Sequence, residues 1–120
     1  MAYSHFIPCK YGAMTNPKVH FVLVGSGKTW DKTANSNAGG WVSSATFANT
    51  CIDLTYDDTA GGYFVTIPDF TEGGTIAMML YDDAAPSKAS DIFGKYYFRY
   101  DAVLDGIVEL PNNRIVQVNA

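Results

Sequence analysis

The clearest candidate for chemistry is the stretch VGSGKT at residues 24–29, which follows the apolar run FVLV at residues 21–24. A strand that leads into a glycine-rich loop ending in Lys-Thr is the arrangement that binds nucleotide phosphates. That loop needs a first glycine five positions before the second one, and Val22 occupies this position. It must also continue into a helix, whereas residues 30–40 are polar and Asn-rich and lack helical periodicity. The sequence therefore predicts a glycine turn at a strand end rather than a nucleotide site.

The histidines and cysteines are isolated from one another in the sequence. His5 and His20 lie in no motif of the H-E-x-x-H type, and no serine lies in a G-x-S-x-G elbow. Two buried thiols are more usual than a disulfide in a chain without a secretion signal, although a bond between Cys9 and Cys51 stays open. Because these residues form no catalytic constellation, we expect a protein that is not an enzyme and has no cofactor.

The sequence Tyr-Asp-Asp occurs twice, at residues 56–58 and 81–83, each time at the end of an expected strand. If the two strand ends lie at one edge, their four carboxylates would be close together and could bind Ca²⁺. Aspartate also favours turns, because its carboxylate accepts hydrogen bonds from the nearby backbone. No EF-hand-like loop is present, so we assign no metal ligands and keep calcium as the alternative to the turn interpretation.

Two tryptophans flank an Asn- and Gly-rich segment, and residues 25–40 are expected to form one long loop. A compact domain rarely keeps a loop of this length without a use. We therefore select Trp30, Asn35, Asn37 and Trp41 as candidate partner contacts. The tryptophans have two other interpretations: a platform that stacks on sugar rings, or anchors that pack the loop against the domain.

Composition and charge restrict the partners. The net charge is −4, and the eight Lys and Arg residues are scattered, which argues against sequence-independent nucleic-acid binding. The apolar runs at residues 19–24 and 75–81 are far shorter than the roughly 20 residues of a membrane span, and residues 1–11 do not resemble a signal peptide. We expect one domain, residues 1–120, that is made and assembles in a cytoplasm without a nucleic-acid or membrane partner.

Short β-type runs separated by Gly, Pro and Asp turns indicate an all-β sandwich or barrel. Residues 51–57 and 63–67 are expected to pair as a hairpin. The only expected helical turn is at residues 87–93. The expected strands are residues 3–10 (at an edge), 19–24, 51–57, 63–67, 75–81, 96–100, 107–110 and 115–118.

From Thr50 onward the chain resembles the small immunoglobulin-like β-sandwich domains of phage virion proteins, which include baseplate, tail and head-decoration components. The resemblance lies in one order of motifs: a strand at 52–55, a turn and Gly-x-Tyr strand at 58–68 ending in Pro68, a glycine turn at 73–74, a strand at 76–81, a Pro-x-x-x-Ser-Asp segment at 86–91, and an Asp-Gly turn at 105–106. The family often has a Trp before that last glycine, whereas this chain has none in residues 100–106. The resemblance does not extend to residues 1–49.

The resemblance implies an assembly role rather than an active site. We therefore expect an immunoglobulin-like antiparallel β-sandwich with one long loop, which acts as a structural component of a bacteriophage virion. Its expected partners are a major capsid or tail protein and copies of itself, bound through loops and edge strands. The alternative function is a carbohydrate-binding β-sandwich that uses exposed aromatic residues.

Overall fold

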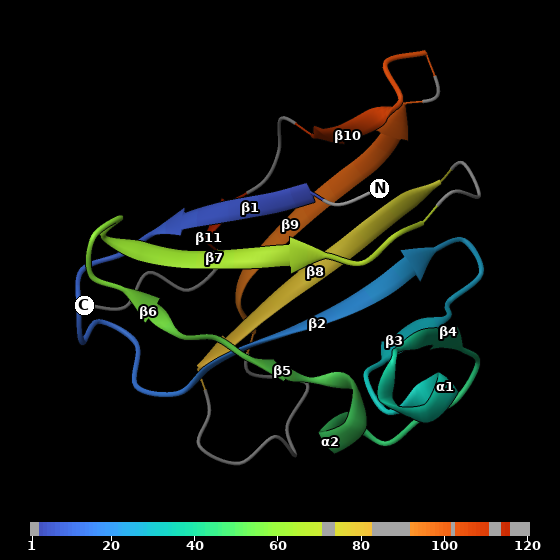
Figure 1. Cartoon of the computed structure of the whole chain (residues 1–120), viewed down its shortest axis with the longest axis horizontal. Coiled ribbons are helices and arrows are strands. Elements are labelled where there is room, and N and C mark those ends of the chain that lie inside the picture. Colours follow the sequence, from blue (N-terminus) through green and yellow to red (C-terminus); the bar gives the residue numbers. More distant parts are fainter. Residues whose placement is uncertain (1–2, 71–73, 83–91, 102, 111–113, 116–120) are drawn as a thin grey trace.

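Every strand pairing in the structure is antiparallel, and the strands form two sheets (Figure 1). The structure is a computed structural model, which describes residues 3–70, 74–82, 92–101, 103–110 and 114–115. The smaller sheet has the order β1-β7-β6, formed by Tyr3–Pro8, Gly62–Ile67 and Tyr56–Asp57. The larger sheet has the order β10-β9-β8-β2-β3-β4, formed by Gly106–Glu109, Ile92–Asp101, Thr75–Asp82, Pro17–Val24, Thr29–Asp31 and Gly40–Val42. In addition, β11 (Arg114–Ile115) pairs with β9 and β5 (Ile52–Asp53) pairs with β2.

The two sheets pack face to face around one core (Figure 1). Alternate residues of each strand point inward, as the period of two in a strand requires. Burial of each large apolar side chain contributes about 1.5–3 kcal/mol to folding. The core includes Tyr63, Val65 and Ile67 from β7, and Val19, Phe21, Leu23, Ile76, Met78 and Leu80 from β2 and β8. The expectation of an all-β antiparallel fold is confirmed.

Most of the expected strands are present, with ends shifted by a few residues. Thus β1, β2, β7, β8, β9 and β10 correspond to the runs at residues 3–10, 19–24, 63–67, 75–81, 96–100 and 107–110. Of the run at 115–118, residue Ile115 lies in β11 and the others lie outside the described residues. The helical turn at 87–93 is wrong at its end, because Ile92 and Phe93 belong to β9, and residues 87–91 lie outside the described part.

The expected strand at residues 51–57 is wrong as a single strand. Its first part, β5, pairs with β2 of the larger sheet, whereas its last part, β6, pairs with β7 of the smaller sheet. We call residues 52–57 the bridging segment, because they run from one sheet to the other. Only the hairpin contact of Tyr56 and Asp57 with Tyr63 and Gly62 matches the expected pairing.

The expected long loop at residues 25–40 is also wrong. It contains β3, the four-residue helical turn α1 (Ala34–Asn37) and the first residue of β4, so a small hairpin folds against the edge of β2. We call residues 29–42 the tryptophan hairpin. The turn α1 has four residues, too few to show a helical period, and Asn35 and Ser36 have left-handed backbone angles, with φ of 55° and 57°.

A second short helix, α2 (Phe47–Thr50), was not expected from the sequence and follows the tryptophan hairpin. Its Phe47 ring contacts the rings of His20 and Tyr81 on the outer face of the larger sheet, with centroids 5.2 Å apart in both cases. Within the described residues, no helix is long and apolar enough to span a membrane.

Candidate functional site

The tryptophan hairpin brings together all four candidate contact residues. Trp30 and Trp41 lie opposite each other on β3 and β4, with ring centroids 5.2 Å apart and planes at 72°. Both side chains are half-buried and pack against the core, and Trp41 Nε1 donates a hydrogen bond to the carbonyl of Asp69 at 2.9 Å. This edge-to-face pair anchors the hairpin and lacks the coplanar exposed faces that a sugar platform needs.

Polar side chains fix the turn between the two tryptophans. Asp31 Oδ1 accepts hydrogen bonds from the hydroxyl and the amide of Thr33, at 2.6 and 2.8 Å. These bonds favour the ionised carboxylate and hold the pKa of Asp31 below its ordinary value. Asn35 Nδ2 donates to the carbonyl of Gly39 at 3.1 Å. A Cβ on Gly39 would lie 2.3 Å from the Trp30 ring, so the glycine makes room for the tryptophan.

The four candidate contacts therefore differ in what they present to solvent. Trp30 and Trp41 are half-buried, and the Asn35 amide takes part in the turn, although the residue is exposed. Asn37 is exposed, and its backbone N–H donates to the carbonyl of Thr33 at 3.1 Å. The group is mainly a structural unit with one exposed polar surface.

The stretch VGSGKT is a tight turn between β2 and β3. The N–H of Gly27 donates to the carbonyl of Leu23 at 2.9 Å, and the N–H of Leu23 donates to that of Lys28 at 2.8 Å. Gly25 and Gly27 have φ of 106° and 76°, which explains the two glycines. The chain continues into a strand, so no helix N-terminus faces the turn. The turn interpretation is confirmed.

The Tyr-Asp-Asp sequences serve turns and strand ends. Asp82 accepts hydrogen bonds from the amides of Thr15 and Asn16, at 3.0 and 2.7 Å, and so holds the chain that leads into β2. Asp57 Oδ1 accepts the amide of Ala60 at 2.9 Å in the turn before β7. Across the ranges that the structure describes, no three His, Cys, Asp or Glu side chains form a metal-binding group, and Asp83 lies outside them.

His5 joins the two sheets. Its side chain is buried against the rings of Tyr96 and Phe98, with centroids 5.1 and 5.2 Å away. Its Nδ1 lies 3.0 Å from Glu109 Oε2, and the Tyr3 hydroxyl donates to the same oxygen at 3.1 Å. Burial raises the pKa of Tyr96 to about 12, and the negative charge of Glu109 adds to the effect. The contacts tie β1 to β10 and are structural.

His20 lies on the opposite face of the larger sheet. The Thr50 hydroxyl donates to the carbonyl of Phe47, so it accepts a hydrogen bond from His20 Nδ1 at 2.9 Å. Burial lowers the pKa of His20. Cys9 and Cys51 are free thiols, and burial raises the pKa of each, which disfavours the reactive thiolate.

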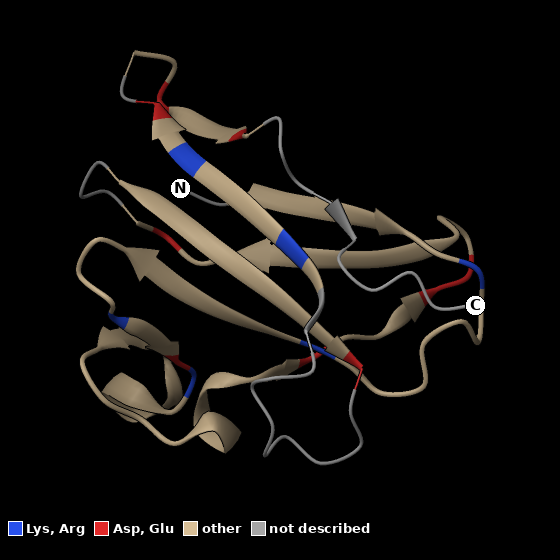
Figure 2. Ribbon diagram, turned by 180° about the vertical axis from the view of Figure 1, so that it is seen from behind, with Lys and Arg blue, Asp and Glu red and all other residues tan. Residues whose placement is uncertain are grey.

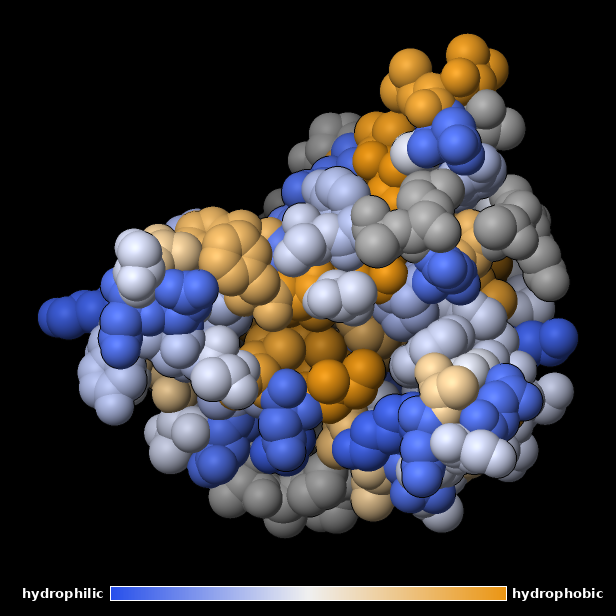
Figure 3. All heavy atoms as spheres, in the orientation of Figure 1, coloured by the Kyte–Doolittle hydropathy of each residue, from blue (hydrophilic) through white to orange (hydrophobic). Residues whose placement is uncertain are grey.

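Sequence reasoning missed an opening between the two sheets. A cavity of about 860 Å³ lies beside the bridging segment, where the chain crosses from β2 to β7. Its walls are mainly apolar and come from Val19 and Phe21 of β2, Ile52 and Leu54 of the bridging segment, and Val65 of β7. Figure 3 shows an apolar hollow on this face, surrounded by polar residues. Such a volume is within the range of about 300–1,000 Å³ that is typical of ligand sites.

One edge of β7 is unpaired along this cavity. Cys9 donates its N–H to the carbonyl of Gly61 at 3.2 Å, so this carbonyl faces β1. Because backbone carbonyl and N–H groups alternate in direction along a strand, the N–H and C=O of Phe64 and Thr66 in β7 face away from β1. Among the described residues, the pairing with β6 covers Tyr63 and the residue before it and does not reach Thr66, so the N–H and C=O of Thr66 have no strand partner. We call the cavity together with this edge the β7 opening.

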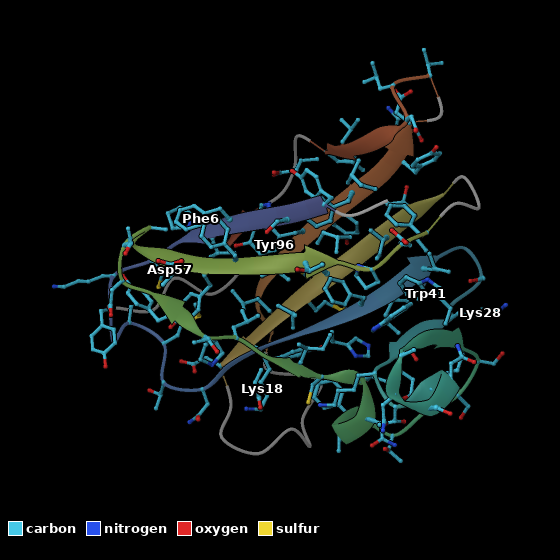
Figure 4. All side chains as sticks on the ribbon, in the orientation of Figure 1. Phe6, Lys18, Lys28, Trp41, Asp57 and Tyr96 are labelled. Carbon is cyan, nitrogen blue, oxygen red and sulfur yellow. The ribbon has the colours of Figure 1, made fainter. Side chains whose placement is uncertain are left out.

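Carboxylates line the rim of the β7 opening. Asp53 forms an ion pair with Lys18, with Nζ and Oδ1 3.1 Å apart. Asp57 and Asp58 lie at the opposite end of the bridging segment and have no cation within ion-pair distance among the described side chains. Figure 4 labels Asp57 on β6 and Lys18 on β2. The rim therefore keeps a negative end.

A second exposed apolar surface is the tip between β9 and β10. Val103 and Leu104 are 93% and 70% exposed. Asp101 Oδ1 accepts the N–H groups of both residues, at 2.9 and 3.1 Å, and the Tyr100 hydroxyl donates to Asp105 at 2.5 Å. These hydrogen bonds stabilise the turn, while the side chains of Val103 and Leu104 face solvent.

Positive charges are dispersed. Lys95 and Arg99 lie four positions apart on β9, and the other Lys and Arg residues of the described part lie in separate elements or loops (Figure 2). Spacing of this kind does not make the dense basic surface that binds a phosphate backbone.

The local pattern of residues 51–67 does not predict the β7 opening. The pairing with β7 ends at Tyr56 because the residues before it turn toward β2, where the Leu54 N–H donates to the carbonyl of Pro17 at 3.0 Å. No protein-family model matches this chain, and no curated protein or solved structure matches it either.

Proposed function

We propose that the chain is a structural component of a bacteriophage virion, either a capsid-decoration or a tail-associated protein. It binds neighbouring proteins through loops and edge strands. The resemblance of the chain from Thr50 onward supports this assignment, as does the two-layer antiparallel fold. The immunoglobulin-like identity of the sandwich is part of the same proposal, and the strand order of an experimental structure would test it.

The β7 opening is the observation that carries the proposal. Enzyme pockets combine apolar walls with convergent polar groups, usually including a histidine, cysteine or paired acid and base. The lining of this cavity contains apolar residues, threonines, Tyr56 and rim carboxylates, and no His, Cys, Lys or Arg among the described residues. An apolar cavity beside an unpaired strand edge is instead suited to binding another polypeptide.

The carbohydrate-binding alternative has weaker support. A sugar platform requires aromatic faces that are exposed and coplanar, whereas Trp30 and Trp41 meet at 72° and are half-buried. The Trp41 indole N–H is also already bonded to the Asp69 carbonyl.

Sedimentation with virus particles tests the proposed function. The purified chain is mixed with particles of its source that lack it, and bound and free protein are separated by centrifugation. We expect saturable binding with a fixed number of copies per particle. The proposal fails if the chain stays monomeric at high concentration and binds no particle of its source.

A further inference from the structure

We propose that the β7 opening binds an extended β-strand of a partner protein, which carries alternate apolar side chains and a Lys or Arg at the end near Asp57 and Asp58. This inference rests on the proposed function, because it names the kind of partner segment that the binding surface accepts.

The backbone of β7 provides the first part of the site. Thr66 directs its N–H and C=O groups toward the opening, beyond the end of the pairing with β6. A guest strand that continues the line of β6 would satisfy these two groups. Strand addition of this kind recognises main-chain groups and is independent of most side chains of the guest.

The cavity provides the second part. Successive side chains of a strand point to opposite faces, so every second side chain of a guest on this edge would point into the space between the sheets. That space is lined by Phe21, Ile52, Leu54 and Trp30, and it has a volume of about 860 Å³. The guest must therefore have apolar residues at alternate positions, while the others face solvent beside Thr66.

Charge decides which class of strand fits. Asp57 and Asp58 lie at one end of the rim, and the whole chain has a net charge of −4. A second copy of this chain would bring further negative charge to that end, which disfavours a contact between copies. A guest with a Lys or Arg there gains an attraction that salt screens, since the carboxylates are at the surface.

Peptide selection with paired proline variants tests the proposal. A displayed library of random nine-residue peptides is selected against the full chain, and the affinities of the enriched peptides are measured for three proteins: wild type, Thr66→Pro and Ser4→Pro. Thr66 and Ser4 are cross-strand partners in the smaller sheet. Their N–H groups point to its two opposite edges, so each proline removes one outward donor without breaking the β1–β7 pairing.

We expect enriched peptides with alternating apolar residues and a basic residue at one end. Thr66→Pro should weaken their binding about tenfold or more, and Ser4→Pro should leave it within about twofold. The double variant Asp57→Asn, Asp58→Asn should weaken binding several-fold at low salt and reduce its salt dependence. Peptides with alternation but no basic preference, or equal binding by both proline variants, would overturn the proposal, and so would a selection that enriches nothing.

Amide exchange on the wild-type chain keeps the test decisive if Thr66→Pro does not fold. An enriched peptide should slow the exchange of the Thr66 amide and leave the amide of Ser4 unchanged. Protection elsewhere, without the Thr66 amide, would overturn the proposal. If the chain binds particles but enriches no strand-like peptide, only this inference fails. If it binds neither particles nor peptides, the proposed function fails as well.

Discussion

Substitution of Gly39 by alanine should destabilise the tryptophan hairpin through two separate effects. Gly39 has φ of 95°, a region that residues with a Cβ rarely adopt. The added Cβ would also lie 2.3 Å from Cζ2 and 2.8 Å from Cε2 of Trp30, so the indole ring must move. Because Trp30 packs against the core and against Trp41, a shift of its ring disturbs both contacts.

The size of the stability loss can be judged by comparison with a matched control variant. Gly27→Ala has the same kind of backbone strain, with φ of 76°, but its new Cβ would meet no atom within 4 Å. Backbone strain alone costs about 1–2 kcal/mol. Overpacking adds about 1–3 kcal/mol. We therefore expect Gly39→Ala to lose about 2–5 kcal/mol of unfolding free energy and Gly27→Ala only about 1–2 kcal/mol.

Urea unfolding followed by circular dichroism and tryptophan fluorescence measures the difference. The chain has two tryptophans, both in the hairpin, so fluorescence reports directly on this unit. The native emission of Gly39→Ala should change, and that of Gly27→Ala should match the wild type. Equal losses of stability in the two variants, with unchanged emission in both, would refute the packing of Trp30 on Gly39 and reopen its interpretation as an exposed platform.

Three further predictions concern polar groups of the fold. Asp82→Ala should lower the free energy of unfolding in urea by about 1–3 kcal/mol, because two backbone amides lose their acceptor. The control variant Asp58→Ala should change it by less than about 0.5 kcal/mol. Equal losses in the two variants would contradict the role of Asp82. Since burial raises the pKa of Tyr96 to about 12, the folded state keeps a proton that the unfolded state loses near pH 10. The free energy of unfolding should therefore fall by up to about 1.4 kcal/mol per pH unit between about pH 10 and 12. Tyr96→Phe should reduce this slope, and an unchanged slope would contradict the contribution of Tyr96. Burial lowers the pKa of His20, so as the pH falls the unfolded state binds a proton before the folded state does. Stability should therefore decrease below about pH 6.5, and it should decrease less steeply in His20→Gln. Identical pH profiles of the two proteins would exclude this contribution.

The strands were predictable where a strand is long and its buried side chains give a clear pattern. Alternation in β7 and the long apolar runs of β2 and β8 reflect burial between two sheets, so composition and period suffice to locate them. The glycine turn at VGSGKT was predictable because its sequence fails the requirements of a phosphate loop.

The remaining features depend on contacts that no local pattern encodes. The bridging segment has continuous β-type composition, but Ile52 pairs with Val19 in one sheet and Tyr56 with Tyr63 in the other. Three-dimensional pairing decides where such a strand divides. The tryptophan hairpin could not be predicted because β3 and β4 have only three residues each, which is too short to show alternation, and the segment between them is polar. The β7 opening results from the division of the bridging segment, so it could not be predicted before that division was known.

Hydrogen–deuterium exchange of the chain bound to the virus particle proposed as its partner tests most directly whether the β7 opening is the binding surface. Exchange is followed by mass spectrometry for the free chain and for the chain bound to particles of its source, with residues 63–68 compared with residues 3–8 of the neighbouring strand β1. We predict that binding slows exchange in 63–68 and in the bridging segment and leaves 3–8 nearly unchanged. Binding without added protection of 63–68 would contradict the account, because the contact would then lie on another surface.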